Sequence, residues 1–158
     1  MLNLRTKPIE HKGVYQVRSL AEVVMGPVEI LLVEDNVGDV VLIRQVLTME
    51  CPVAVNLHIA RDGEQALLLL TNPPFKLGLI ILDLNIPKIT GLALLKRWQV
   101  METPKVVFSS SMDEVEQKQT LTYGAREFVR KPTDIVGFMD AVYSMVEKWA
   151  MPPANEIG

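Results

Sequence analysis

Charged side chains follow several of the apolar stretches of this chain. Glu34 and Asp35 come directly after the first stretch, Asp83 after a later one, and Lys131 after the last. Asp83 lies 48 residues after Asp35 and 48 residues before Lys131. Carboxylates beside an ammonium group can bind a hard divalent cation together with a phosphate, and a carboxylate can itself act as a nucleophile. These residue types therefore point to phosphoryl chemistry, provided that the fold brings them together.

Three carboxylates at one place need positive charge. Two like charges ~4 Å apart cost about 4 kcal/mol at an effective dielectric constant of about 20. Lys131 supplies one cation, and a divalent ion with oxygen ligands is the expected second. We therefore expect Mg²⁺ beside Glu34, Asp35 and Asp83, with the Ser109 hydroxyl near it. Such a set resembles the apparatus of phosphoryl transfer, in which cations offset the charge on the phosphoryl oxygens.

Each of these residues also has a structural alternative when it is taken alone. Asp35 or Asn36 could simply cap the helix that follows the first strand. The Lys131-Pro132 pair is an ordinary corner between a strand and a helix, and serine runs such as 109–111 are common in loops. Their joint occurrence at the ends of strands in one alternating pattern favours the functional interpretation.

Short apolar stretches alternate with stretches of helical periodicity between residues 28 and 149. The predicted strands are 28–33, 53–59, 77–82, 105–108 and 127–130. The predicted helices are 37–49, 64–70, 92–100, 112–123 and one that starts at 133 or 134 and runs to 149. Strands that are mostly apolar rather than alternating belong in a parallel sheet covered on both faces. With right-handed crossovers, this pattern predicts a doubly wound α/β fold around a five-stranded parallel sheet.

The carboxyl ends of parallel strands form the edge at which such sheets bind ligands. If the strand order is 2-1-3-4-5, the first and third strands are neighbours at the point where the order reverses. Glu34, Asp35 and Asp83 would then lie close together. Ser109 and Lys131 would reach the same edge from the fourth and fifth strands.

Sequence signals also mark the ends and faces of two helices. Ser111, followed three residues later by Glu114, matches a capping box at the start of helix 112–123. Gly124 is well placed to end that helix at the C′ position. The predicted core face of the last helix consists of Ile135, Met139, Val142, Val146 and Trp149.

Composition argues against several classes of protein. A chain of 158 residues is close to one domain, and a net charge of −3 with a pI near 5.4 disfavours nucleic-acid binding. Cys51 is the one cysteine, which excludes an intrachain disulfide and fits a reducing cytoplasm. No apolar run approaches the ~18 residues of a membrane span, and no secretion signal begins the chain.

The two ends of the chain differ from its middle. Residues 1–26 carry four basic residues against two acidic ones and no sustained periodicity. We expect a flexible extension there, with a docking arm as an alternative and Met25 as a candidate true start. Residues 27–150 form the predicted domain, and residues 151–158 form a short tail.

Five motifs in order make residues 28–149 resemble the response-regulator receiver domain of two-component signalling. They are Leu32-Val33-Glu34-Asp35-Asn36, Asp62-Gly63-Glu64-Gln65-Ala66, Leu82-Asp83-Leu84-Asn85-Ile86-Pro87, Ser109-Ser110 and Lys131-Pro132. The resemblance implies the flavodoxin-like receiver fold. It also implies a signalling protein, not a conventional enzyme, that catalyses only its own phosphoryl transfer and autodephosphorylation.

The resemblance assigns acceptor and metal-binding roles to four positions. Asp83 matches the residue that accepts a phosphoryl group from a phosphohistidine. Asp35 matches a direct Mg²⁺ ligand, and Asn85 would offer its backbone carbonyl. Glu34 matches the second acid, whose longer side chain favours contact with the metal through water.

Four further positions match the family's phosphoryl-binding and switch residues. Lys131 matches the lysine that pairs with the phosphoryl group, and the peptide bond after it is often cis in the family. Ser109 would turn its hydroxyl toward the phosphoryl oxygens, while Ser110 stays small to admit the donor. Phe128 occupies the aromatic switch position, where the lack of a hydroxyl favours an inward, buried side chain. Movement of Ser109 and Phe128 would then alter the face of helix 112–123.

The resemblance also implies protein partners. A sensor histidine kinase or a phosphotransfer protein would donate the phosphoryl group, and a downstream protein would receive the signal. Formation of a homodimer is a further possibility. Nine residues follow position 149, which predicts a stand-alone receiver. The Glu34-Asp35-Asn36-x-x-Asp39 start is also similar to small receivers that partner phytochrome-type kinases, although Asp39 equally suits the first turn of a helix.

Three alternative functions compete with this one. A haloacid-dehalogenase-like phosphatase would carry a second acid two residues after the nucleophile, where this chain has Asn85. A flavodoxin-like binding protein would need a phosphate-binding loop where Glu34 and Asp35 would repel phosphate. A degenerate receiver that serves as a scaffold would not need the acids and Lys131 that are present here.

Overall fold

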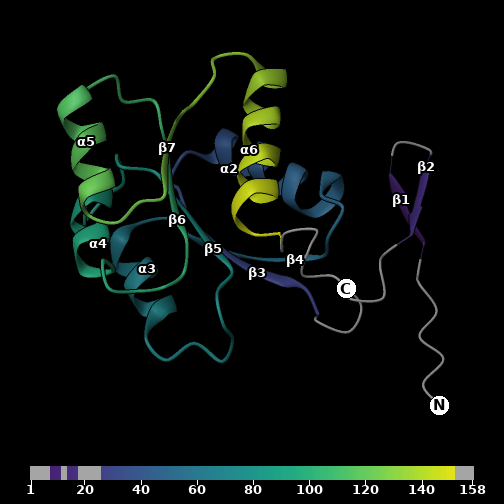
Figure 1. Ribbon diagram of the computed structural model, residues 1–158, viewed down its shortest axis with the longest axis horizontal. Helices are drawn as coiled ribbons and strands as arrows, with labels where there is room; N and C mark the ends of the chain where they lie inside the picture. The colour runs from purple at the N-terminus through teal and green to yellow at the C-terminus, as the bar shows by residue number, and fades with distance from the viewer. Residues whose placement is uncertain (1–7, 12–13, 18–25, 152–158) are drawn as a thin grey trace.

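Five parallel strands form the central sheet of the computed structural model, which describes residues 8–11, 14–17 and 26–151 (Figure 1). In spatial order the strands are β4 (Val55–Ala60), β3 (Val28–Val33), β5 (Leu79–Leu82), β6 (Lys105–Ser109) and β7 (Glu127–Arg130). Numbered along the chain, these strands follow the order 2-1-3-4-5. The predicted fold and strand order are therefore confirmed.

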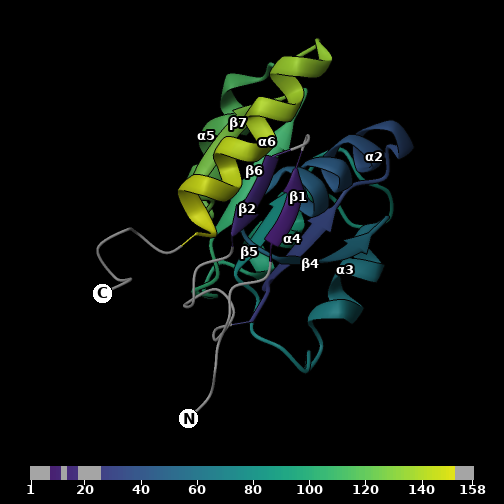
Figure 2. The same cartoon turned by 90° about the vertical axis from the view of Figure 1, so that its right-hand side faces the viewer.

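Five α-helices cover the two faces of this sheet. They are α2 (Val37–Gln45), α3 (Gly63–Leu70), α4 (Gly91–Arg97), α5 (Glu114–Thr122) and α6 (Ile135–Trp149). A short π-helix, η1 (Val46–Glu50), extends α2. The helices α2 and α6 lie on one side, and α3, α4 and α5 on the other (Figure 1). Figure 2, which turns the first layer toward the viewer, shows α6 in front of β6 and β7.

The core consists of two apolar layers, one on each face of the sheet. Successive residues of β3 alternate between them, since Ile30 belongs to the layer that contains Val142 of α6 while Leu31 belongs to the layer that contains Leu94 of α4. All four of these side chains are buried. Each contributes roughly 1.5–3 kcal/mol by leaving water. This two-sided burial explains why every residue of β3 from Ile30 to Val33 is apolar.

The start of α5 differs from the prediction. Asp113, not Ser111, is the N-cap, and its Oδ1 accepts a hydrogen bond from the backbone N–H of Val115 at 2.9 Å. Ser111 lies before the helix and donates its hydroxyl to Glu116. A carboxylate at the N-cap also has favourable electrostatics with the helix dipole, which a hydroxyl lacks. The capping-box prediction was therefore wrong by two residues.

The end of α5 agrees with the sequence. Gly124 has a φ of +93°, and its N–H bonds to the carbonyl of Leu121. The next N–H, of Ala125, bonds to the carbonyl of Thr120 at 3.0 Å. These paired bonds are a Schellman motif, in which the C′ residue favours glycine because φ is positive.

The apolar face of α6 also needs one correction. Val142 and Val146 are fully buried as predicted, but Ile135 is 62% exposed, and Phe138 and Met145 complete the core face. Ile135 occupies the first turn, where it lines a cavity near the carboxyl edge. Helical periodicity predicts which side of the helix a side chain lies on. It does not predict whether the core extends as far as the first turn of the helix.

The N-terminal extension contains elements that were not predicted. Strands β1 (Pro8–His11) and β2 (Val14–Val17) form an antiparallel pair, drawn to the right of the sheet in Figure 1. The proposed start at Met25 and most of the tail lie outside the described residues. Within the residues described, no helix combines the length and apolar composition needed to cross a bilayer.

Candidate functional site

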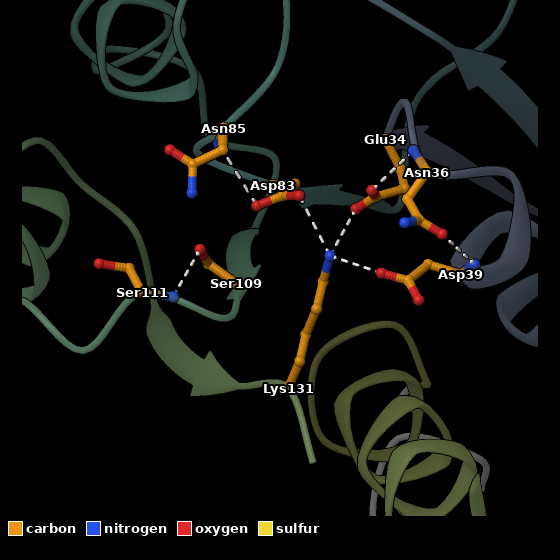
Figure 3. Close-up of polar contacts among 8 residues, drawn as sticks. All are labelled: Glu34, Asn36, Asp39, Asp83, Asn85, Ser109, Ser111 and Lys131. Carbon is orange, nitrogen blue, oxygen red and sulfur yellow. Dashed lines mark hydrogen bonds and ion pairs between the residues drawn. The ribbon is translucent and has the colours of Figure 1, made fainter. Parts of the chain in front are cut away.

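The carboxyl edge of the sheet gathers charged side chains from three strand ends. Glu34 follows β3, Asp83 follows β5, and Lys131 follows β7 (Figure 3). All three side chains are at most 9% exposed. The strand order brings Glu34 and Asp83 together, because β3 and β5 pair directly and Val33 is in register with Leu82.

The Lys131 ammonium is the centre of this group. Its Nζ lies 2.9 Å from Glu34 Oε2, 2.8 Å from Asp39 Oδ2 and 3.1 Å from Asp83 Oδ2. An ammonium group has three N–H donors and no acceptor, so these carboxylates use all of them. Burial alone would lower the pKa of Lys131, but hydrogen bonds to Asp39 and Glu34 outweigh it and raise that pKa.

Two interpretations of Asp39 were equally compatible with the sequence. Asp39 lies in the first turn of α2, where its own N–H donates to the N-cap Asn36 at 2.9 Å. Its carboxylate turns toward the edge of the sheet and reaches Lys131 (Figure 3). The spacing of four residues after Asp35 was the available signal, but spacing could not show which way the side chain points.

Glu34 is the most deeply buried acid of the group. Its Oε1 accepts the backbone N–H of Asn36 at 3.0 Å, and the residue is 1% exposed. Burial, followed by repulsion from Asp83, raises the pKa of Glu34 to about 7, although Lys131 pulls in the opposite direction. A further cation close to Glu34 would stabilise the charged form of its carboxyl group.

Three acids at this edge could share a metal ion. One carboxylate oxygen from each of Glu34, Asp35 and Asp83 lies within 4.8 Å of the others. Asp35 is exposed, while the other two are buried, so the group opens to solvent on one side. Carboxylate oxygens with access to water are the ligands that Mg²⁺ prefers. The donor set therefore fits Mg²⁺.

Asn85 and the serines after β6 complete the neighbourhood. The N–H of Asn85 points to Asp83 Oδ1 at 3.4 Å. Ser109 is fully buried, and its Oγ accepts the N–H of Ser111 at 3.2 Å. Ser110 is exposed and lines a cavity of about 320 Å³ beside Lys131. Figure 3 shows the side chains of Ser109 and Asn85 near Asp83, on the opposite side from Asp39.

Phe128, for which the resemblance favoured an inward, buried side chain, is half-buried. On one side it packs against the apolar layer that contains Val107. On the other it lines a groove between α5 and β7, beside Leu121 and Gln117. The peptide bond between Lys131 and Pro132, for which the resemblance left a cis form open, is trans.

Comparison with known proteins gives one family match. The family model described as "Response regulator receiver domain" matches residues 30–143. This segment contains every site residue described above.

Three similar proteins illustrate the range of the family. The transcriptional regulatory protein CpxR of Klebsiella pneumoniae is 34% identical over 105 residues, which cover 66% of this chain and 43% of CpxR. The sporulation initiation phosphotransferase F of Bacillus subtilis is 31% identical over 116 residues, covering 72% of this chain and 90% of that protein. The chain thus spans less than half of CpxR but matches nearly all of the phosphotransferase.

A solved structure provides the third comparison. The phosphorylated cyanobacterial phytochrome response regulator RcpA superposes with a TM-score of 0.71 at 27% identity, covering 82% of this chain and 100% of RcpA. The chain therefore shares its fold with a phytochrome response regulator.

Proposed function

The chain belongs to the response regulator receiver domain family, and we propose that it accepts a phosphoryl group on Asp83 from a histidine kinase or a phosphotransfer protein. The observation that carries this proposal is the contact of 3.1 Å between Lys131 Nζ and Asp83 Oδ2 at a largely buried site. An ammonium there can offset negative charge on a group attached to Asp83.

The transfer is a displacement at phosphorus. A carboxylate oxygen of Asp83 forms a bond to phosphorus while the bond from phosphorus to the donor's imidazole nitrogen breaks. The electron pair leaves with that nitrogen. Lys131 then pairs with the phosphoryl oxygens, and Ser109 donates its hydroxyl to one of them. Exposed Ser110, at the cavity beside Lys131, leaves space for the donor.

In this proposal Mg²⁺ binds at the acidic edge. Asp35 and Asp83 would hold it directly with the carbonyl of Asn85, and Glu34 through water. When bound, the ion would offset the negative charge of the phosphoryl oxygens. The three acid oxygens within 4.8 Å of one another support this assignment.

The phosphoryl donor would dock over α2 and the start of α6. Val37 and Val41 of α2 are 63% and 55% exposed, and Ile135 and Val136 of α6 are 62% and 70% exposed. The cavity beside Lys131 lies between these two helices. Exposed apolar side chains beside a reactive site favour a protein partner over a small substrate. We place this exchange in the cytoplasm, where ATP is available to the kinase.

The output of the domain would be a change at α5 and β7. When the Ser109 side chain rotates to donate its hydroxyl to the phosphoryl group, its Oγ would release the N–H of Ser111, and Phe128 would move further inward from the groove that it lines. The signal then passes to another protein, or the phosphoryl group passes on in a relay. Coverage of 90% of a phosphotransferase supports a function that needs no second domain. Hydrolysis of the acyl phosphate resets the site.

Labelling by a small donor tests the proposal. Incubation with acetyl phosphate and Mg²⁺ should add the mass of one phosphoryl group to the intact protein. Asp83→Asn should not gain it, because an amide is a poor nucleophile. Asp140→Asn removes an equal charge from an exposed position on α6 and should label like the natural sequence. An unlabelled natural protein, or equal labelling of Asp83→Asn, would overturn the proposal.

A further inference from the structure

We propose that Asp39 is a positioning residue that holds the Lys131 ammonium when a divalent cation engages Glu34 and Asp83. The inference rests on the proposed function only in assigning the cation to the acidic edge. It concerns a carboxylate that lies outside the metal-binding set and has no assigned role in the transfer.

The carboxylates at this edge form two overlapping sets. The group that could hold a metal consists of Glu34, Asp35 and Asp83. The group that holds the ammonium consists of Glu34, Asp39 and Asp83. Two acids therefore belong to both sets. Asp35 serves the metal alone, and Asp39 serves the ammonium alone.

Sharing creates a conflict between the two cations. The Lys131 side chain is 7% exposed, so its charge needs a partner inside the protein. A divalent cation at Glu34 and Asp83 draws their charge away from the ammonium and repels it. Asp39 then remains as a full carboxylate at 2.8 Å from Nζ, the shortest of the three contacts. The ammonium can stay paired in the site while the metal binds.

The backbone around α2 fixes Asp39 for this role. Glu34 accepts the N–H of Asn36, and the Asn36 side chain accepts the N–H of Asp39. This series of bonds ties the start of α2 to the end of β3. The Asp39 side chain is 25% exposed, compared with 2% for Glu34. It reaches the ammonium from the α2 side in Figure 3 and lines the same cavity as Ser110.

Loss of the Asp39 charge should weaken metal binding. In Asp39→Asn the ammonium would keep only Glu34 and Asp83 as charged partners, and a metal would have to compete for both. We expect Mg²⁺ affinity, measured by titration calorimetry on the unphosphorylated protein, to fall about tenfold, as coupling within one ion-pair network permits. Asp39→Glu keeps the carboxylate and should restore most of the affinity. Asp140→Asn, which removes a charge elsewhere, should leave it unchanged.

A double-mutant cycle with Lys131→Met separates anchoring from a through-space effect of charge. Without the ammonium, Asp39→Asn should lower Mg²⁺ affinity by no more than about twofold. Equal losses with and without Lys131, or no rescue by Asp39→Glu, would overturn the role of Asp39. Absence of Mg²⁺ binding by the natural sequence would overturn the metal assignment in the proposed function as well. Strong binding by the natural sequence with unchanged binding by Asp39→Asn would overturn this inference alone.

Discussion

The Lys131 ammonium lies 3.1 Å from the Asp83 carboxylate, although β6 separates the strands that carry them. The lysine side chain reaches past β6 along the carboxyl edge, and its Nζ lies 5.8 Å from the ring centroid of Phe108, a residue of β6. One cation from the edge strand β7 thereby offsets part of the negative charge of the acids that follow β3 and β5. Loss of Lys131 should therefore lower the free energy of unfolding of the protein more than loss of a surface lysine.

Replacing Lys131 by Met should destabilise the metal-free protein strongly. Removal of one partner of a buried ion pair costs about 3–5 kcal/mol, because the remaining charges stay buried without compensation. Glu34 and Asp83 would be left in that state. Urea unfolding near neutral pH in the presence of a chelator measures the loss. Addition of Mg²⁺ should recover much of it, since a ligand that binds only the folded state stabilises that state.

Lys148→Met provides the matched control for that experiment. Lys148 pairs with Glu127 at 3.3 Å, but its side chain is 58% exposed. Exposed pairs contribute at most about 1 kcal/mol. Similar losses for the two variants would contradict the central role of Lys131.

Glu34 should make the metal-free protein less stable as the pH rises toward neutral. Its pKa rises from 4.5 to about 7 in the folded state, chiefly through burial. Between these values the folded protein retains a proton that the unfolded chain releases, so a rising pH favours unfolding. The stabilising contribution of Glu34 is complete below its unfolded pKa of 4.5 and is lost as the pH rises past its folded pKa of about 7. Relative to Glu34→Gln, the free energy of unfolding should fall by roughly 1–3 kcal/mol between about pH 5 and pH 8.

Glu147→Gln is the control for this pH dependence. This change at an exposed position of α6 should leave the dependence of unfolding free energy on pH as it is in the natural sequence. A difference between the natural sequence and Glu34→Gln that stays constant with pH would show that Glu34 ionises as freely in the folded protein as in the unfolded chain.

The sheet and its polar edge could be predicted because both follow from local rules. Continuous apolar stretches such as Leu79–Leu82 require cover on both faces, and the alternation with helices then determines which strand ends meet. The contact between Asp39 and Lys131 could not be predicted. These residues are 92 positions apart in the sequence, and their contact depends on the rotamer of each side chain. The exposure of Ile135 depends on how far the core extends beyond the sheet. Both are tertiary properties that periodicity does not encode.

Gly91→Ala should disturb the acceptor through the backbone. A Cβ atom at Gly91 would lie 2.5 Å from the carbonyl oxygen of Asp83 and 2.7 Å from the Cα of Leu84. Backbone atoms cannot rotate away as a flexible side chain can, so the loop that carries Asp83 must shift. Overpacking of this kind costs about 1–3 kcal/mol. We expect a lower urea midpoint and slower labelling by acetyl phosphate.

Gly38→Ala is the comparison for Gly91→Ala. Its Cβ would meet only the side chain of Asn36, at 3.4 Å, and alanine in a helix is favoured over glycine by about 0.5–1 kcal/mol. This variant should be at least as stable as the natural sequence. If Gly91→Ala also gained stability and labelled at the natural rate, the close approach to Asp83 would have no effect on function.

Ser109→Ala should separate phosphorylation from its effect at α5 and β7. The hydroxyl of Ser109 accepts the N–H of Ser111, so its loss should cost about 1 kcal/mol of stability. Asp83 should still be labelled, but hydrogen exchange in β7 and α5 should no longer respond to acetyl phosphate, because no hydroxyl links the new group to Phe128. Ser110→Ala, at an exposed neighbour, should retain the response. An undiminished exchange response in Ser109→Ala would mean that the signal reaches Phe128 by a route that does not include this hydroxyl.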